Sequence, residues 1–438
     1  MLLLWPVAYN GFPLVFADTN AYLASIYEFG TPLDRPPYYR LFASGVAHFT
    51  GTYGLAAAQA ALAALVLYLM VKALAPSARP AQLLAIILLL GLVTSLPWEA
   101  SWIMPDLFGG LAICCVLLLG PLNKTISGSE RTFASALLVF GMIAHSGSLI
   151  TCLAMIAFTV VGLLWRGCRD DRTAAIRLAA LAFLAVTSSV LPNLQLTGRI
   201  TINPTSNLFM LGRLAGDGLL QPYLKHQCPA EPTLVLCDQA KKLEGASEND
   251  FLWGDGFLDR QFDAAFKPEP YARLVRSVIL YNLPAFIWTS ARSSLTLLFA
   301  GSPLHQDTFA RVNAADFSDD LDRGGLLGPP FTSSRQHTTG IALEWLGAVQ
   351  IAVQLAAILA LAGIVGLNNT GRRRSDPFVT ISALVLLALL VNAAVHGVTS
   401  GAFVRYQAKV SWIPVLVALL YLFDLYNRTV RQSPVQQS

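Results

Sequence analysis

Two short stretches organise this chain: Phe-Ala-Asp-Thr-Asn-Ala-Tyr at residues 16–22 and Pro-Leu-Asp-Arg-Pro-Pro-Tyr-Tyr-Arg at residues 32–40. They belong to a charged, proline-rich segment that lies between strongly apolar ones. Asp18 directly follows an apolar run, so we expect it at a membrane boundary, where burial raises and a neighbouring cation lowers the pKa of a carboxylate. Asp18 is therefore a candidate proton acceptor. The alternative is that Asp18 and Asn20 merely cap the next helix.

The rest of the chain is mostly apolar. Of its 438 residues, 55% are hydrophobic and only 13% are charged, which is about half the charge of an ordinary soluble domain. This composition predicts an all-α polytopic membrane protein and gives no indication of nucleic-acid binding. The formal net charge of +4 sets no orientation by itself, because the positions of Lys and Arg decide it.

Long apolar runs mark the membrane-spanning helices that we expect, since a helix needs about 20 apolar residues to cross a bilayer. The run before Asp18 lacks the basic start and the cleavage site of a signal peptide, and so it predicts a first span. We expect about ten spans, at residues 1–16, 53–74, 81–97, 105–121, 132–145, 147–165, 174–193, 343–367, 377–397 and 407–426.

Basic residues gather in five of the short connections. If both termini are cytoplasmic, these five connections all face the cytoplasm, as basic loops of membrane proteins usually do. The basic residues are Lys72, Arg79, Lys124, Arg131, Arg166, Arg169, Arg172, Arg177, Arg372, Arg373, Arg374, Arg428 and Arg431. The chain then divides into a membrane module (1–197) with an outer loop (17–52), an outer region (198–342), a second membrane part (343–426) and a cytoplasmic tail (427–438).

Residues 198–342 are predicted to form a loop-rich cap outside the membrane. Its apolar stretch at 274–300 contains Arg292, and a crossing there would invert the later basic loops. We therefore expect a pair of interfacial helices, with a true span as the alternative. Cys228 and Cys237 flank eight residues of the cap, a spacing that suits a local disulfide in an oxidising compartment; two free thiols are the alternative. No Cys-x-x-Cys pair indicates a redox or metal site.

Ionisable residues at the outer ends of the spans are candidate site residues, because such groups are costly to place and often functional. Arg405 and Lys409 stand four residues apart on one helical face, where they could hold a phosphate; snorkelling to lipid headgroups is the alternative. Asp106 begins a span and could instead serve the helix dipole. The full set is Asp18, Asp34, Arg35, Arg40, Glu99, Asp106, His145, Arg405, Tyr406 and Lys409. A lone histidine such as His145 is more often structural than catalytic.

The order of these pieces resembles the C-type (GT-C) integral-membrane glycosyltransferases, in the broad group of the protein mannosyltransferases and the lipid A aminoarabinose transferase. The resemblance rests on residues 10–22, 35–42 and 104–108 and on Arg405-Tyr406. It covers residues 1 to about 195 best and the last two spans moderately. This chain has fewer spans than the larger members and no separate soluble C-terminal domain, which leaves the acceptor open.

The resemblance implies transfer of a sugar from a polyprenyl-phosphate donor to an acceptor outside the membrane, by an enzyme of a bacterial inner membrane with its site on the periplasmic side. Asp18 would be the catalytic base, and Glu99 or Asp106 the second acidic residue. The residues implied for the donor phosphate are Arg405, Lys409, Tyr406, Arg35 and Arg40, with Asp34 and His145 as auxiliary residues. A divalent metal on Asp18 and Asp106 is compatible with this chemistry and not required by it.

Two other classes of function use the same features. A transporter or lipid flippase would use the charges as a relay, although the chain shows no internal repeat of the kind that builds many transporters. A non-catalytic assembly subunit would keep the fold and tolerate the loss of every carboxylate named above. Membrane lipids are expected partners in all three cases.

Overall fold

The computed structural model of the chain describes residues 2–23, 35–166, 168–253, 268–304, 309, 328–368 and 377–432. Within these ranges the chain is helical and contains no strand, which confirms the all-α prediction for this part; one isolated bridge joins Leu14 to Trp102. The helices are η1 (Leu2–Leu4), α1 (Trp5–Asn10), α2 (Thr19–Leu23), α3 (Pro37–Leu74), α4 (Pro80–Val93), α5 (Leu96–Ser101), α6 (Asp106–Leu119), α7 (Gly128–Ala144), α8 (Ser146–Arg166), α9 (Arg169–Thr197), α10 (Ser206–Gly216), α11 (Leu220–Gln227), η2 (Cys237–Gln239), α12 (Glu248–Trp253), α14 (Pro268–Tyr281), α15 (Leu283–Leu298), α17 (Gly328–Thr332), α18 (Arg335–Thr338), α19 (Glu344–Asn368), α20 (Pro377–Thr399) and α21 (Arg405–Gln432).

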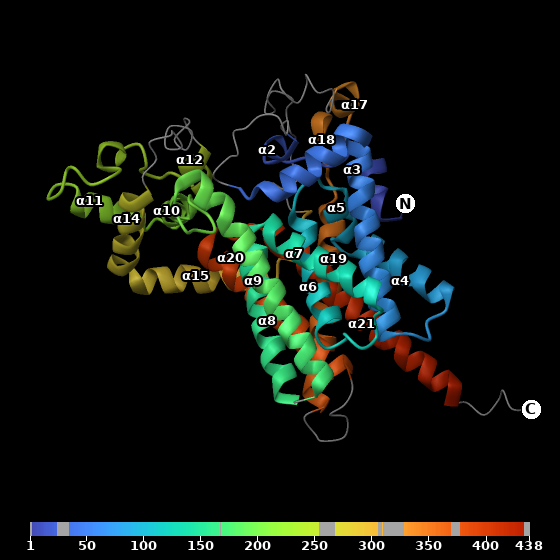
Figure 1. Cartoon of the computed structure of the whole chain (residues 1–438). Helices are drawn as coiled ribbons and strands as arrows, with labels where there is room; N and C mark the ends of the chain where they lie inside the picture. Colours follow the sequence, from blue (N-terminus) through green and yellow to red (C-terminus); the bar gives the residue numbers. More distant parts are fainter. Residues whose placement is uncertain are drawn as a thin grey trace, which may run out of the picture.

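Six of the described helices are long and apolar enough to cross a membrane: α3, α8, α9, α19, α20 and α21. The chain is therefore an integral membrane protein by the length and composition of its helices. This count is lower than the predicted ten. The runs at 81–97 and 105–121 correspond to α4 and α6, which are apolar but have only 14 residues each. Every residue of α6 is buried, so this helix forms the centre of the bundle (Figure 1).

The predicted first span is wrong, because the chain leaves the helix after α1. Gly11 adopts φ 82° and caps α1, a left-handed conformation that favours glycine. The chain then runs extended. The Leu14 N–H donates to the carbonyl of Ser101 and the Leu14 carbonyl accepts from the N–H of Ile103, both at 2.9 Å. An apolar run can fill a protein core as well as a bilayer, and this one packs beside α5.

The helix α3 bends near its middle. Gly51 has φ 70° and ψ −179°, outside the helical region, and the two parts of α3 run in different directions (Figure 1). The first part leads away from the proline-rich segment at its start, and the second part is the span. The bend thus connects the segment that carries Arg35 to the membrane bundle.

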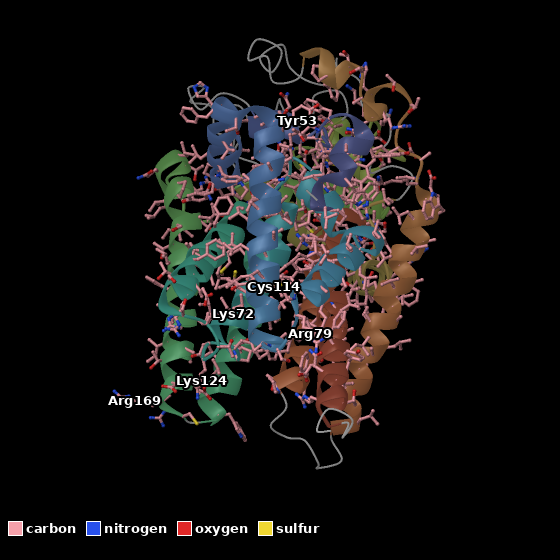
Figure 2. The ribbon with its side chains drawn as sticks, turned by 90° about the vertical axis from the view of Figure 1, so that its right-hand side faces the viewer. Tyr53, Lys72, Arg79, Cys114, Lys124 and Arg169 are labelled. Carbon is pink, nitrogen blue, oxygen red and sulfur yellow. A yellow bond between two sulfur atoms is a disulfide. The ribbon has the colours of Figure 1, made fainter. Side chains whose placement is uncertain are left out.

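Basic side chains gather at one end of the bundle. Figure 2 shows Lys72, Arg79, Lys124 and Arg169 on the other side of Cys114 from Tyr53. One of them also helps to hold the bundle together, since Lys72 Nζ lies 2.7 Å from Glu130 at the start of α7. This distribution agrees with the predicted arrangement of the basic loops, except that Arg372, Arg373 and Arg374 lie outside the described residues.

A second hydrophobic core lies apart from the bundle. Helices α10, α11, α12 and α14 surround it and are called the cap below; members of this core include Leu208, Leu211, Phe251, Leu274 and Val278. Cys228 and Cys237 form a disulfide here, with Cα atoms 5.5 Å apart, which is the predicted pairing. Helices α17 and α18, which also fall within residues 198–342, pack elsewhere: the Gln336 side chain hydrogen-bonds to the backbone of Val15.

The apolar stretch at 274–300 forms two helices that meet at Asn282. Neither α14 nor α15 is among the candidate spans. The helix α15 lies across the bundle rather than along it (Figure 1) and packs against α20. Its outward face carries Ile287, Trp288 and Leu295, whose exposed fractions are 59%, 69% and 59%. An apolar exposed face on a helix of this orientation agrees with the expected interfacial placement.

Candidate functional site

Asp18 lies between two arginines that come from distant parts of the chain. Its Oδ1 is 2.6 Å from Arg35 Nη2, and its Oδ2 is 3.1 Å from Arg405 Nη1. Asp18 precedes α2, Arg35 precedes α3 and Arg405 begins α21. The three side chains are 17–18% exposed. Two of the predicted groups of site residues therefore meet here; these three residues are called the rim site.

Aromatic rings hold the two guanidinium groups of the rim site. The Arg405 guanidinium carbon lies 4.7 Å from the ring centre of Phe16 and 4.9 Å from that of Tyr406. The Arg35 guanidinium carbon lies 5.8 Å from the Tyr22 ring and 5.7 Å from the Trp253 ring of the cap. Such contacts fall within the range of cation–π attraction. Both arginines are thus oriented before any ligand arrives.

The ion pairs decide the charge of Asp18. Burial alone would raise the pKa of this carboxyl, but the Arg35 and Arg405 guanidiniums outweigh burial and hold the pKa below its ordinary value. Asp18 is therefore ionised at neutral pH, and both of its oxygens are engaged. The capping role considered for Asp18 is not what its side chain does in the structure, since the side chain bonds to the two arginines.

A second group of charged residues lies deeper in the bundle. Lys409, one turn along α21 from Arg405, has its Nζ 3.1 Å from His396 Nε2 and 4.0 Å from Asp106 Oδ1. The His396 ring stacks on the Tyr406 ring, with centres 4.3 Å apart. Lys409, Asp106 and His396 are at most 2% exposed. Together with Glu99 they are called the inner cluster.

Glu99 is as enclosed as Asp106 and Lys409. The residue is 1% exposed, and neither carboxylate oxygen has a hydrogen-bond partner among the described residues. Burial raises its pKa well above the ordinary value, and the neighbouring Asp106 carboxylate adds to the effect. Burial thus favours the protonated form of Glu99. It does not line the rim site, where a substrate could reach it.

The remaining predicted residues have other positions. Arg40 is buried in the first part of α3, outside the Asp18 ion pairs, and Asp34 lies outside the described residues. Burial lowers the pKa of His145 well below its ordinary value, and Lys409 and Arg405 add to this. His145 is thus neutral, and its Nδ1 accepts the N–H of Gly147.

The carboxylates suggested as metal ligands face cations instead. Asp18 is paired with two arginines, and Asp106 lies beside Lys409. Within the described ranges, no group of three His, Cys, Asp or Glu residues could hold a metal ion. The residues that the structure brings together therefore suit an anion, and they do not fit the Asp18–Asp106 metal site considered above.

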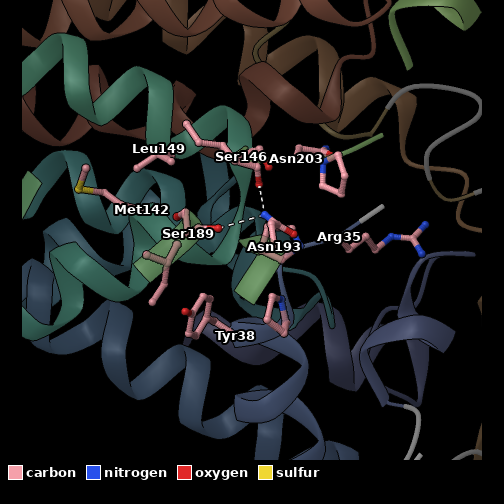
Figure 3. Close-up of a pocket in the computed structure, with 13 residues that line it drawn as sticks. Arg35, Tyr38, Met142, Ser146, Leu149, Ser189, Asn193 and Asn203 are labelled. Atoms are coloured by element: carbon pink, nitrogen blue, oxygen red, sulfur yellow. Dashed lines mark hydrogen bonds between the residues drawn. The ribbon is translucent and has the colours of Figure 1, made fainter. Parts of the chain in front are cut away.

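A pocket opens next to the rim site, between the start of α3 and helices α7, α8 and α9. The empty space in and around the pocket, part of which is open solvent, is about 370 Å³. Figure 3 shows that the Arg35 guanidinium points away from the other labelled side chains. The Asn193 amide donates to the carbonyls of Ser189 and Ile202 at 3.0 and 2.8 Å. Arg35 thus lines this pocket and also pairs with Asp18.

Three residues near the site carried little signal in the sequence. His396 was one of two isolated histidines at span ends. Trp253 and Glu248 lie at the two ends of α12, in a polar region with no periodic pattern that would associate them with Asp18. Cap residues of this kind are brought to the site by tertiary packing, which spacing along the chain does not encode.

Comparisons with known proteins give no further assignment. No protein-family model, no curated protein and no solved structure matches this chain.

Proposed function

We propose that this chain is a membrane glycosyltransferase that moves a sugar from a polyprenyl-phosphate donor to a hydroxyl acceptor on the outer side of the membrane. One observation carries the proposal: two preoriented guanidiniums flank a carboxylate at the partly exposed rim of a membrane bundle. Guanidiniums bind phosphate through paired directed donors. A carboxylate beside a bound phosphate is the arrangement that sugar transfer to a hydroxyl requires.

The reaction in this proposal is a single displacement. The acceptor oxygen attacks the anomeric carbon, a carboxylate takes its proton, and the lipid phosphate leaves with the electron pair of the broken bond. Arg35 and Arg405 stabilise the negative charge that develops on the departing phosphate. Inversion at the anomeric carbon is the expected outcome.

The geometry gives the other predicted residues supporting roles in this proposal. Lys409 is 1% exposed, so it acts on a bound phosphate through its charge and not by contact. The ring stack of His396 and Tyr406 keeps the start of α21 in place. The proposal includes a bacterial inner membrane with the site on the periplasmic side, which the basic end of the bundle supports, since that end would face the cytoplasm.

A transporter or lipid flippase is the second candidate, because charged residues inside a membrane bundle often form a relay. The inner cluster favours this candidate: Glu99, Asp106 and Lys409 are each about 1% exposed and lie among apolar helices. A transporter would depend on these residues and would release no lipid phosphate.

The test is a transfer assay with the full chain in lipid nanodiscs. Polyprenyl-phosphate sugars and envelope acceptors are supplied, and release of polyprenyl phosphate is measured. Asp18→Asn is expected to lower the rate strongly, because this carboxylate holds the two guanidiniums that would bind the donor phosphate. Asp170→Asn, at an exposed carboxylate of α9, is the matched control and should keep the parent rate.

The outcomes separate the candidates. Release of lipid phosphate that depends on Asp18 supports the transferase. If the parent chain releases no lipid phosphate with any donor, and transport of a lipid-linked sugar across vesicles depends on Asp106 or Lys409, the transferase is contradicted and the transporter takes its place.

A further inference from the structure

The cap reaches the rim site through α12. At the end of this short helix, the Trp253 ring lies 5.7 Å from the Arg35 guanidinium. At its start, the Glu248 carboxylate accepts a hydrogen bond from the backbone N–H of Gly401, four residues before Arg405. The two ends of α12 thus contact the two segments whose arginines hold Asp18. Glu248 is a second carboxylate beside the rim site, and it comes from a part of the chain to which the resemblance assigns no site residue.

Glu248 lies very close to the chain at Gly401. A Cβ atom at Gly401 would come within 2.5 Å of Glu248 Oε2, so a larger residue there would displace the end of the Glu248 side chain. Gly401 is itself buried, and it belongs to the connection between α20 and α21. The contact therefore places the carboxylate beside the connection that leads into α21, where Arg405 lies.

The charges around Glu248 come from three elements. Burial raises its pKa to about 7, against the lowering effects of Arg213, the Gly401 N–H and Arg405; Asp217 raises it further. Arg213 of α10 is largely neutralised by its own ion pair with Asp217 at 3.1 Å. Glu248 is consequently half ionised near neutral pH, which is the condition under which a carboxylate exchanges protons most effectively.

Asp18 and Glu248 differ in what they can do. Asp18 has both oxygens in ion pairs, and its pKa is held low by two arginines. To accept a proton it must first lose those partners to the donor phosphate. Within the described residues Glu248 forms no ion pair with these arginines, and it lies close enough to Arg405, the arginine to which the phosphate would bind, for that charge to lower its pKa.

We propose that Glu248 is the catalytic residue that accepts the proton of the acceptor hydroxyl, and that Asp18 positions the two guanidiniums. This inference rests on the proposed glycosyl transfer. The acceptor oxygen bonds to the anomeric carbon while its proton passes to a Glu248 carboxylate oxygen. The bond from the anomeric carbon to the phosphate oxygen breaks, and the electron pair stays on the phosphate, held by Arg35 and Arg405.

The test compares pH profiles of the transfer reaction, with the full chain in nanodiscs and lipid-phosphate release as the readout. For the parent, kcat/KM should rise with pH through about 7, because only ionised Glu248 accepts a proton. Glu248→Gln should lose roughly 10²- to 10⁴-fold in kcat/KM and lose this rise. Glu244→Gln, an exposed carboxylate of the cap, should match the parent in rate and profile.

Two further variants distinguish chemistry from folding. Glu248→Asp keeps a base with shorter reach, so it should recover part of the rate and a pH-dependent rise. Asp18→Asn should lower the rate but keep the rise near pH 7. If Glu248→Gln keeps the parent rate and profile, the proton role of Glu248 is overturned while the transferase stands. If the parent releases no lipid phosphate, the proposed function falls and this role falls with it.

Discussion

The rim site and the inner cluster are built from similar residues but are under different physical constraints. In the rim site the carboxylate is paired twice, its partners are preoriented by aromatic rings, and all three side chains remain partly exposed. In the inner cluster one carboxylate lies 4.0 Å from its cation and the other has no partner among the described residues. The comparison indicates that the rim site can exchange its partners for a ligand, whereas the inner cluster is held by burial.

The largest effect on stability is expected in the inner cluster. Lys409→Ala leaves the Asp106 carboxylate buried beside no cation, and breaking a buried pair in this way costs about 3–5 kcal/mol in the free energy of unfolding. Thermal unfolding in nanodiscs measures this loss of stability, and Lys241→Ala, at an exposed residue of the cap, is the control. The double variant Lys409→Met with Asp106→Asn should recover most of the loss. A single variant as stable as the parent would contradict a stabilising pair between Lys409 and Asp106.

The next effect separates function from stability in the rim site. Arg405→Ala removes a donor to the phosphate, and loss of one such donor lowers the rate about 10²- to 10³-fold. Because Arg405 is partly exposed and Asp18 keeps Arg35, unfolding should change by less than about 1.5 kcal/mol. Steady-state transfer and thermal unfolding are measured on the same samples, with Arg292→Ala in α15 as the control. If Arg405→Ala lost as much stability as Lys409→Ala, the rim site would be as structural as the inner cluster, and the difference drawn between them would be contradicted.

The sequence predicted much of the rim site, for a physical reason. Asp18 ends an apolar run and Arg405 precedes another, so both were expected at the outer ends of apolar segments, although the run before Asp18 packs beside α5 and does not cross as predicted. The aromatic contacts and the ion-pair distances were beyond prediction, because they depend on how the bend at Gly51 and the start of α21 bring the segments together.

Other features could not be read from the sequence. Glu99 follows an apolar run in the sequence, which suggested an outer loop. In the structure α5 packs inside the bundle, and the Glu99 carboxylate is buried there. The run before Asp18 is as apolar as a span, and the single left-handed residue Gly11 turns it into a packed segment. Glu248 has no flanking pattern at all. In each case tertiary packing, and not local composition, decides where the charge lies.

The smallest effect is expected for Glu99→Gln. Burial favours the protonated form of Glu99, so the amide replaces a group of the same shape without removing a favoured charge. At pH 5 the free energy of unfolding should change by less than about 1 kcal/mol, the size of one hydrogen bond. The transfer rate should stay near that of the parent, since Glu99 does not contact the rim site.

The effect of Glu99→Gln should nevertheless depend on pH. In the unfolded parent Glu99 has the ordinary glutamate pKa of about 4.5, whereas burial raises its pKa well above that value in the folded chain. Between these two pKa values the folded chain keeps a proton on Glu99 that the unfolded chain has lost. The parent therefore loses stability as pH rises from 4.5 towards the folded pKa. Glutamine does not titrate, so the variant does not lose this stability. The free energy of unfolding of the variant relative to the parent should therefore rise between pH 5 and pH 8, as measured by chemical or thermal unfolding. A variant that is instead several kcal/mol less stable at every pH would mean that Glu99 is ionised and paired in the fold, and the inner cluster would then resemble the rim site.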